Sequence, residues 1–208
     1  RWSIFLLAPL LHFFGRVDIP FPGWCKLWKR PIDAHLTWLE TIWYNSRFDW
    51  ENISLDGTLD SWDKILNAGF WVTSTESLLI ASVLRSGQTT IQGAAIEPHV
   101  MNLISFLREA WADIKIRYDH VIVVQGVAEL KNDFEFRIVS DYLESGTYMI
   151  IGALIAEKYL TIENARIEDL VPFIEKLKEA WVRVEDLWND TLRVHRVKNL
   201  KEVSIQTN

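Results

Sequence analysis

The sequence predicts an α+β fold built from three similar units, and three observations lead to that prediction. Charged helical segments end alike at Trp43, Trp111 and Trp181. These tryptophans are spaced by 68 and 70 residues, close to a third of the 208-residue chain. Each segment also occupies the same place in a series of apolar helix, short strand, charged helix and two strands. Such units cannot bury their apolar faces alone, so we expect them to pack around a pseudo-threefold axis.

The elements of each unit follow in order from the residue pattern. A helix rich in small and apolar residues is expected at 3–11, 77–84 and 147–155, and a short strand at 16–19, 89–92 and 160–163. The charged amphipathic helices are expected at 34–43, 99–111 and 169–181. In the second of these, Val100, Leu103, Ile104 and Leu107 recur at helical spacing and form one apolar face. Segments 113–117 and 121–124 alternate like paired strands, and Asp119-His120 lies between them as a hairpin turn.

Composition excludes several classes of protein. Hydrophobic residues make up 49% and charged residues 24%, as in an ordinary packed domain. The formal net charge of −6 argues against nucleic acid as the main partner. The apolar segment 2–14 is shorter than the roughly 20 residues that span a bilayer, so no membrane association is expected. A single cysteine indicates a reducing compartment, here the cytoplasm, and the five histidines show no metal-ligand spacing.

One loop is longer in the first unit than in the other two, and this difference in length indicates a functional role. The connection 20–31 is longer than its counterparts 93–98 and 164–168. It carries the only cysteine, Cys25, close to Lys26, Lys29 and Arg30. Cations near a thiol favour the thiolate and attract an anion such as phosphate. The alternative is a solvated basic loop with an incidental cysteine.

Tryptophan stands where the backbone favours glycine. Trp43, Trp111 and Trp181 each follow a charged helix and precede a strand, at the position that commonly adopts a left-handed backbone. Turn-like sequence also surrounds Trp24, Trp62 and Trp188. One hypothesis is that many of these residues are glycines, encoded by UGA in a lineage that reads this codon as glycine. The alternatives are a tryptophan-rich sugar-binding surface and genuine core residues, as Trp38 or Trp50 could be.

The cysteine loop carries a family resemblance. Residues 16–36 include Pro22-Gly23-Trp24-Cys25 and, five residues after the cysteine, Arg30-Pro31-Ile32-Asp33-Ala34-His35. This segment resembles the catalytic loop of the UDP-N-acetylglucosamine enolpyruvyl transferases in the EPSP synthase family, which reads Leu-Pro-Gly-Gly-Cys, three residues, then Ala-Arg-Pro-Val-Asp-Leu-His. The likeness continues at Glu97-Pro98, 140–147, 163–166 and 176–180. Trp24, Trp28, Trp43, Trp111 and Trp181 stand at glycine positions of the family pattern.

The resemblance implies an architecture. The family fold is an inside-out α/β barrel of βαβαββ units, in two lobes around an active-site cleft. Residues 1–138 would form most of the catalytic-loop lobe with two units, and 139–208 one unit of the second lobe. The chain would be about the middle half of such an enzyme, with the general base outside it. The 208 residues alone are therefore expected to be inactive.

The resemblance also implies a reaction and its residues. Enolpyruvate would pass from phosphoenolpyruvate to the 3-hydroxyl of UDP-N-acetylglucosamine, which is the committed step of peptidoglycan synthesis. Cys25 matches the catalytic cysteine that fosfomycin attacks. The residues that match substrate contacts are Arg1, Arg30, Pro31, Ile32, Asp33, Ala34, Trp71 and Val72. Gly69 stands where the family has a Lys against the nucleotide, and Tyr142 replaces a family Arg beside the cleft.

The partners implied are the two small-molecule substrates, with no cofactor, no metal and no nucleic acid, and the full-length enzyme would be a monomer. Two other functions stay open at this point. The protein could be a non-catalytic UDP-sugar-binding relic, or a relative of 5-enolpyruvylshikimate-3-phosphate synthase, although the Cys25 loop speaks against the latter.

Overall fold

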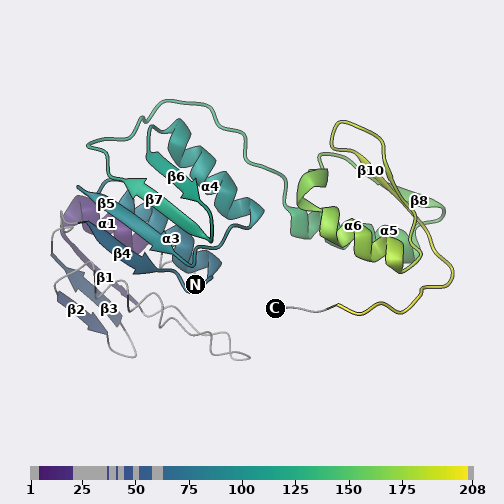
Figure 1. Ribbon diagram of the computed structural model, residues 1–208, viewed down its shortest axis with the longest axis horizontal. Coiled ribbons are helices and arrows are strands. Elements are labelled where there is room, and N and C mark those ends of the chain that lie inside the picture. The colour runs from purple at the N-terminus through teal and green to yellow at the C-terminus, as the bar shows by residue number, and fades with distance from the viewer. Residues whose placement is uncertain are drawn as a thin grey trace. The chain divides into compact units, whose positions relative to one another are not determined.

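The chain forms two compact units, residues 1–136 and 137–208 (Figure 1). The computed structural model describes residues 5–20, 37, 41, 45–48, 52–57 and 63–205. Whether the two units are parts of two lobes around a cleft stays a prediction.

Three open sheets share one strand order, which confirms the threefold repeat. The first is β1-β3-β2, built from β1 (Arg16–Pro20), β2 (Asn45–Phe48) and β3 (Asn52–Asp56). The second is β4-β5-β7-β6, built from β4 (Lys64–Asn67), β5 (Gln88–Gln92), β6 (Asp113–Arg117) and β7 (Val121–Gln125). The third is β8-β10-β9, built from β8 (Tyr159–Ile162), β9 (Val184–Asp186) and β10 (Leu192–His195). In every sheet the strand that comes last in the chain lies between two others and pairs antiparallel with both.

The second repeat is a complete βαβαββ unit. Its order is β4, α3 (Val72–Ser82), β5, α4 (Pro98–Glu109), β6 and β7. Strand β4 adds to the sheet by pairing parallel with β5. The expected barrel is not seen: within the described residues each sheet is open, because its strands pair only inside their own repeat.

The remaining helices are α1 (Leu7–Phe14), α5 (Tyr142–Ile155), the 3-10 turn η2 (Ile167–Asp169) and α6 (Val171–Glu179). Helix α5 begins five residues before its expected start. Asp141 caps it there, since its carboxylate accepts hydrogen bonds from the backbone of Leu143 and Glu144 at 2.8 and 3.2 Å. The helix expected at 34–43 lies mostly outside the described residues.

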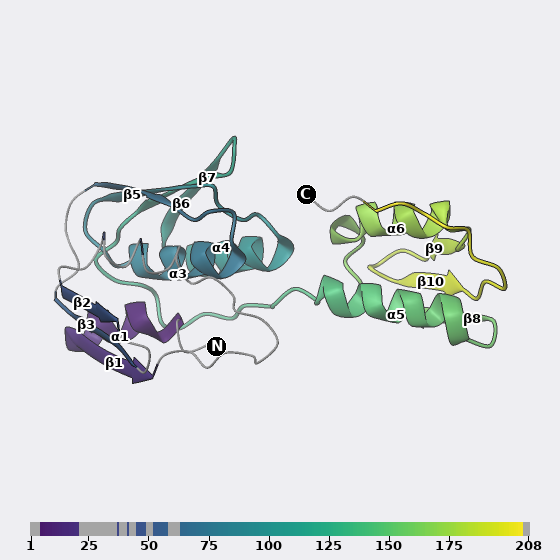
Figure 2. The same cartoon turned by 90° about the horizontal axis from the view of Figure 1, so that it is seen from below.

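The two repeats of the first unit share one hydrophobic core. Leu7 and Leu11 of α1 join Ile53 of β3 and Leu78 of α3 in a single buried cluster. Helices α3 and α4 cover one face of the four-stranded sheet (Figure 2). Burying each large side chain of this kind stabilises the fold by roughly 1.5–3 kcal/mol. A separate core around Met149, Leu170 and Val194 holds the second unit together.

Long-range backbone hydrogen bonds recur with an offset of 70 residues. Val127 N–H donates to Val83 O, and Val197 N–H donates to Ala153 O, each at 2.9 Å. Lys131 N–H donates to Ala110 O, and Lys201 N–H donates to Ala180 O. At these helices and at the turns that follow α4 and α6, residues 70 apart in the second and third repeats can therefore be compared directly, whereas β5 and β8 correspond with an offset of 71.

The charged helices end in left-handed turns at tryptophan, as the sequence predicted. Trp111 has φ 75° and Trp181 has φ 68°. Trp111 N–H donates to Arg108 O at 2.9 Å and Ala112 N–H donates to Leu107 O at 2.9 Å, the paired bonds of a Schellman motif. Helix α6 ends with the same two bonds, from Trp181 and Val182. Both indole rings are mostly exposed, so burial does not offset the strain of a side chain in this conformation.

A third left-handed tryptophan lies in the β9–β10 hairpin. Trp188 has φ 72° and is 79% exposed. Trp24, Trp28, Trp43 and Trp62 lie outside the described residues.

Replacing either helix-end tryptophan by glycine should stabilise the protein. Glycine relieves the Cβ clash of the left-handed backbone but loosens the unfolded chain, so we expect a net gain of about 0.5–1 kcal/mol per site. Urea unfolding of Trp111→Gly and Trp181→Gly measures this gain. The matched controls Trp111→Ala and Trp181→Ala remove the indole but keep Cβ, and should show no such gain. Equal stability of the Gly and Ala variants would show that these turns are not strained.

Candidate functional site

The residues expected to contact substrate fall in two groups. Trp71 and Val72 lie at the start of α3, where Trp71 is the N-cap and is half exposed. The other predicted site residues are outside the described part of the chain: Arg1, Cys25, Arg30, Pro31, Ile32, Asp33 and Ala34. Trp71 and Val72 are therefore the predicted site residues that the structure places. The family motif did not indicate the residues that surround them.

A tight turn presents Trp71 at the edge of the sheet. Gly69 and Phe70 both have left-handed backbones, with φ 65° and 58°. The side chain of Asn67 accepts a hydrogen bond from Gly69 N–H at 2.8 Å, and Trp71 N–H donates to Ala68 O at 3.2 Å. A Cβ at Gly69 would lie 3.0 Å from the Trp71 ring. The turn thus leaves two bulky aromatic rings, Phe70 and Trp71, exposed beside the first turn of α3.

The loop before α4 forms the other side of this edge. Phe70 N–H donates to Gly93 O at 2.7 Å, and Ala95 N–H donates to the Thr75 hydroxyl at 2.9 Å. His120, from the β6–β7 turn, packs edge-on against Phe70 with ring centroids 5.2 Å apart. Its Nδ1 lies 2.8 Å from Ala94 O. These bonds fix the starts of α3 and α4 side by side.

Two glutamates, Glu76 and Glu97, interact electrostatically at this edge, and sequence reasoning did not identify them. Glu76 is the one charged residue in the segment Val72–Ser82. A single charge in an otherwise uncharged helix is the sequence signal by which it could have been identified. Burial, with the neighbouring Glu97 carboxylate adding to it, raises the pKa of Glu76 to about 7. Glu97 Oε2 is buried and has no hydrogen-bond partner among the described residues. Glu76 can therefore hold a proton near neutral pH.

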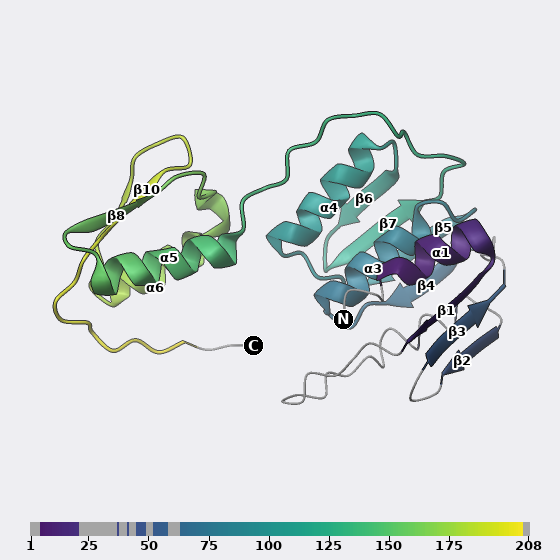
Figure 3. The same ribbon diagram turned by 180° about the vertical axis from the view of Figure 1, so that it is seen from behind.

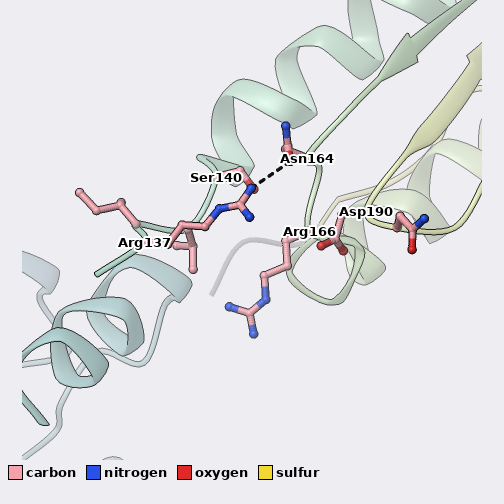
Figure 4. A pocket seen from close by; sticks show the side chains of 8 residues that line it. Arg137, Ser140, Asn164, Arg166 and Asp190 are labelled. Carbon is pink, nitrogen blue, oxygen red and sulfur yellow. Dashed lines mark hydrogen bonds between the residues drawn. The ribbon is translucent and has the colours of Figure 1, made fainter. Parts of the chain in front are cut away.

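The equivalent edge of the second unit holds a cavity of about 680 Å³. Figure 4 shows its lining, with the guanidinium of Arg137 bonded to the Asn164 side chain at 3.2 Å. Asn164 has φ 55° and corresponds to Gly93 of the first unit, because Ala165 bonds to Asp190 as Ala94 bonds to His120. The other lining residues are Ile138, Val139, Ser140, Arg166, Asn189 and Asp190.

The chemistry of this cavity suits an oxyanion. Two guanidinium groups line it, and each can donate paired hydrogen bonds. Arg166 also forms ion pairs with Glu168 and Asp169, at 3.1 and 3.7 Å. Part of its charge is therefore neutralised, and the cavity is only moderately basic.

The described ranges contain neither a metal-ligand cluster nor a membrane-spanning helix. No group of three or more His, Cys, Asp or Glu residues there could hold a metal ion. Within the same ranges no helix is long and apolar enough to cross a membrane.

Comparison with known proteins gives a consistent result over the whole chain. The family model described as EPSP synthase (3-phosphoshikimate 1-carboxyvinyltransferase) matches residues 1–208. A relative named UDP-N-acetylglucosamine 1-carboxyvinyltransferase, from Wolbachia pipientis subsp. Culex pipiens, is 34% identical over 100% of this chain and 48% of its own length. A protein with the same name from Sorangium cellulosum is 35% identical, over 49% of its length. The chain thus spans about half the length of the curated relatives it matches.

Solved structures agree on the fold. The enolpyruvyl transferase NikO from Streptomyces tendae matches 96% of this chain and 48% of its own with a TM-score of 0.79 and 21% identity. EPSP synthase from Acinetobacter baumannii matches 98% of this chain and 48% of its own with a TM-score of 0.65 and 20% identity. At these identities the likeness establishes the fold alone.

Replacing Glu76 should change how stability depends on pH. The folded state favours the protonated carboxyl, whose pKa rises from 4.5 to about 7. The contribution of Glu76 to the free energy of unfolding is therefore fully present below pH 4.5 and is lost as the pH rises through about 7. Glu76→Gln should therefore raise stability at about pH 8, by on the order of 1 kcal/mol after solvent screening, and leave it nearly unchanged at about pH 4.

Urea unfolding across this pH range measures the effect. Glu109→Gln, at an exposed position at the end of α4, is the control and should leave the dependence of stability on pH unchanged. A parallel pH profile for Glu76→Gln and the unchanged protein would contradict the assignment.

Proposed function

The chain belongs to the EPSP synthase family, and from this premise we propose that the complete protein is a UDP-N-acetylglucosamine enolpyruvyl transferase. It would move the enolpyruvyl group of phosphoenolpyruvate to the sugar 3-hydroxyl and release phosphate. One observation supports this most: relatives with that name are 34–35% identical over the whole chain. The reaction would commit UDP-N-acetylglucosamine to peptidoglycan synthesis. We assign the protein to the cytoplasm as a monomer under the same proposal.

Cys25 is proposed as the catalytic acid. As the hydroxyl oxygen attacks carbon 2 of phosphoenolpyruvate, a proton must reach the methylene carbon. Elimination of phosphate, with loss of a proton from the same methyl group, then restores the double bond. A positioned acid typically contributes 10²–10⁴-fold to such a step. Cys25 and Arg30 match the acid and a phosphate contact in the family motif, and fosfomycin would alkylate the same thiol.

The proposed sugar-nucleotide contacts are Arg1, the run Arg30–Ala34, Trp71 and Val72. Trp71 and Phe70 expose aromatic faces where the family pattern has small residues. An exposed indole can stack on a planar base, so Trp71 would add a contact that partly replaces the lysine missing at Gly69. The Glu76–Glu97 pair lies at the same edge, and in the proposed complex the charge that Glu76 gains above about pH 7 would weaken contact with an anionic ligand.

A second candidate function is a UDP-sugar-binding relic that no longer transfers enolpyruvate. The observation that favours it is the presence of Trp24 and Trp28 beside Cys25, because a loop with these side chains could not fold as the glycine-bearing family loop does. A shikimate-pathway activity is the third, and the Cys25 motif speaks against it.

The glycine hypothesis decides between the first two candidates. Trp111 and Trp181 have backbones that suit glycine, and Trp24 and Trp28 stand at glycine positions of the same family pattern. We infer that these positions carry glycine in the natural protein. The catalytic loop would then have its ordinary flexibility, and the transferase would be functional.

Phosphate release by the complete gene product tests the proposal. With glycine at positions 24 and 28, it should release phosphate from phosphoenolpyruvate only when UDP-N-acetylglucosamine is the acceptor. Cys25→Ser should lower kcat by about 100-fold or more and should abolish inactivation by fosfomycin. The 208 residues alone should give no turnover.

Three outcomes separate the candidates. Binding of UDP-N-acetylglucosamine without phosphate release, even with glycine at both positions, would establish the relic. Turnover with shikimate 3-phosphate as acceptor would establish the shikimate-pathway activity. Full activity with tryptophan at positions 24 and 28 would contradict the glycine hypothesis while leaving the transferase proposal intact.

A further inference from the structure

His120 is joined to the loop before α4 by one hydrogen bond that both units share and by a second that its side chain adds. Its carbonyl oxygen accepts a hydrogen bond from Ala94 N–H at 2.8 Å, and the second unit repeats this bond between Ala165 and Asp190 at 2.7 Å. The imidazole of His120 adds the second bond, because its Nδ1 lies 2.8 Å from Ala94 O. A carbonyl oxygen can only accept, so Nδ1 carries the proton.

The ring of His120 also contacts the turn before α3. It meets the Phe70 ring at an interplanar angle of 71°, with the centroids 5.2 Å apart. Phe70 N–H is in turn bonded to Gly93 O, so the three segments form a closed cycle of contacts. Figure 3 shows the β6–β7 turn, which carries His120, beside the starts of α3 and α4. The second unit has no such ring pair, because Ser140 and Asp190 stand at the two equivalent positions.

Phe70 needs contacts from outside its own turn. Its φ of 58° is left-handed, a conformation that bulky side chains rarely adopt. Such a residue keeps its conformation only where the surrounding structure holds it. The ring of His120 supplies a contact of this kind. His120 is itself left-handed, with φ 57°, but histidine tolerates this region better than most residues.

We propose that His120 is a positioning residue for the turn 69–71, and through that turn for the ligand contacts of Trp71 and Val72. The inference rests on the proposed function, which puts those two residues against the sugar nucleotide. The ring of His120 holds Phe70, and the backbone of Phe70 sets the direction of Trp71 at the N-cap of α3. Because His120 is exposed, replacing it leaves no buried cavity and the fold should persist.

His120→Asn isolates the contribution of the ring. Asparagine tolerates a left-handed backbone and carries an amide near the place of Nδ1, so the variant keeps the bond to Ala94 O but loses the contact with Phe70. In the complete protein, amide hydrogen exchange at Phe70 and Trp71 should become about 10-fold faster, because the turn opens more often. Tyr118→Ala, at a 94% exposed position of the same turn, is the matched control and should leave exchange unchanged. Equal exchange in His120→Asn and the unchanged protein would overturn the proposal.

The kinetics of the complete protein test the consequence for binding. His120→Asn should raise the KM for UDP-N-acetylglucosamine about 5–10-fold and leave kcat within about twofold, because the turn contacts the nucleotide and not the reacting atoms. Phe70→Leu should have the same effect, and it decides the matter if His120→Asn fails to fold. The double variant should be no worse than either single variant, since both remove one contact. An unchanged KM in the single variants would overturn the proposal.

Failure of the proposed function would look different. If the unchanged complete protein does not bind UDP-N-acetylglucosamine, the proposed function and the ligand contacts of the turn 69–71 are both contradicted. The exchange measurement needs no ligand, so it still decides whether His120 holds the turn.

Discussion

The left-handed turns that end α4 and α6 are the constraint on which the rest of the structure depends. At Trp111 and Trp181 this turn reverses the chain and directs it into the next strand. The paired bonds to the last carbonyls of the helix fix the direction of that strand. The strand must pair with the final strand of its own repeat, so a change in the turn would shift the whole sheet. The same device recurs after 70 residues, in the second and third repeats.

The turns also determine where chemistry can occur. In the second and third repeats, which run the same course, the starts of the two helices lie at one edge of the sheet. In the first unit that edge carries Trp71, Val72 and the Glu76–Glu97 pair, and in the second it carries the cavity lined by Arg137. Helix starts present unpaired N–H groups, which favour anions such as phosphate. Repetition has thus produced two similar edges whose side chains have different charge.

The sequence allowed the repeat, the succession of helices and strands along each unit and the left-handed helix ends to be predicted, because these follow from local spacing and backbone preference. It did not allow the contacts among distant turns to be predicted. Packing of His120 against Phe70 joins residues 50 positions apart, and neither carries a motif. The proton affinity of Glu76 likewise depends on burial and on Glu97, which only the folded arrangement supplies. The family fold was predicted correctly, but periodicity does not show which sheet edges remain unpaired, so the open form of the sheets in the described residues had to come from the structure.

The central claim is that glycine, not tryptophan, belongs at the left-handed helix ends and in the catalytic loop. The most direct measurement is tandem mass spectrometry of peptides from the native protein, read together with the codons for Trp24, Trp28, Trp43, Trp111 and Trp181. Glycine masses at UGA codons are the predicted result. They would explain both the left-handed helix ends and the glycine positions of the catalytic loop. Tryptophan masses at UGG codons would contradict it, and would leave a divergent family member whose helix ends are strained and whose loop is altered.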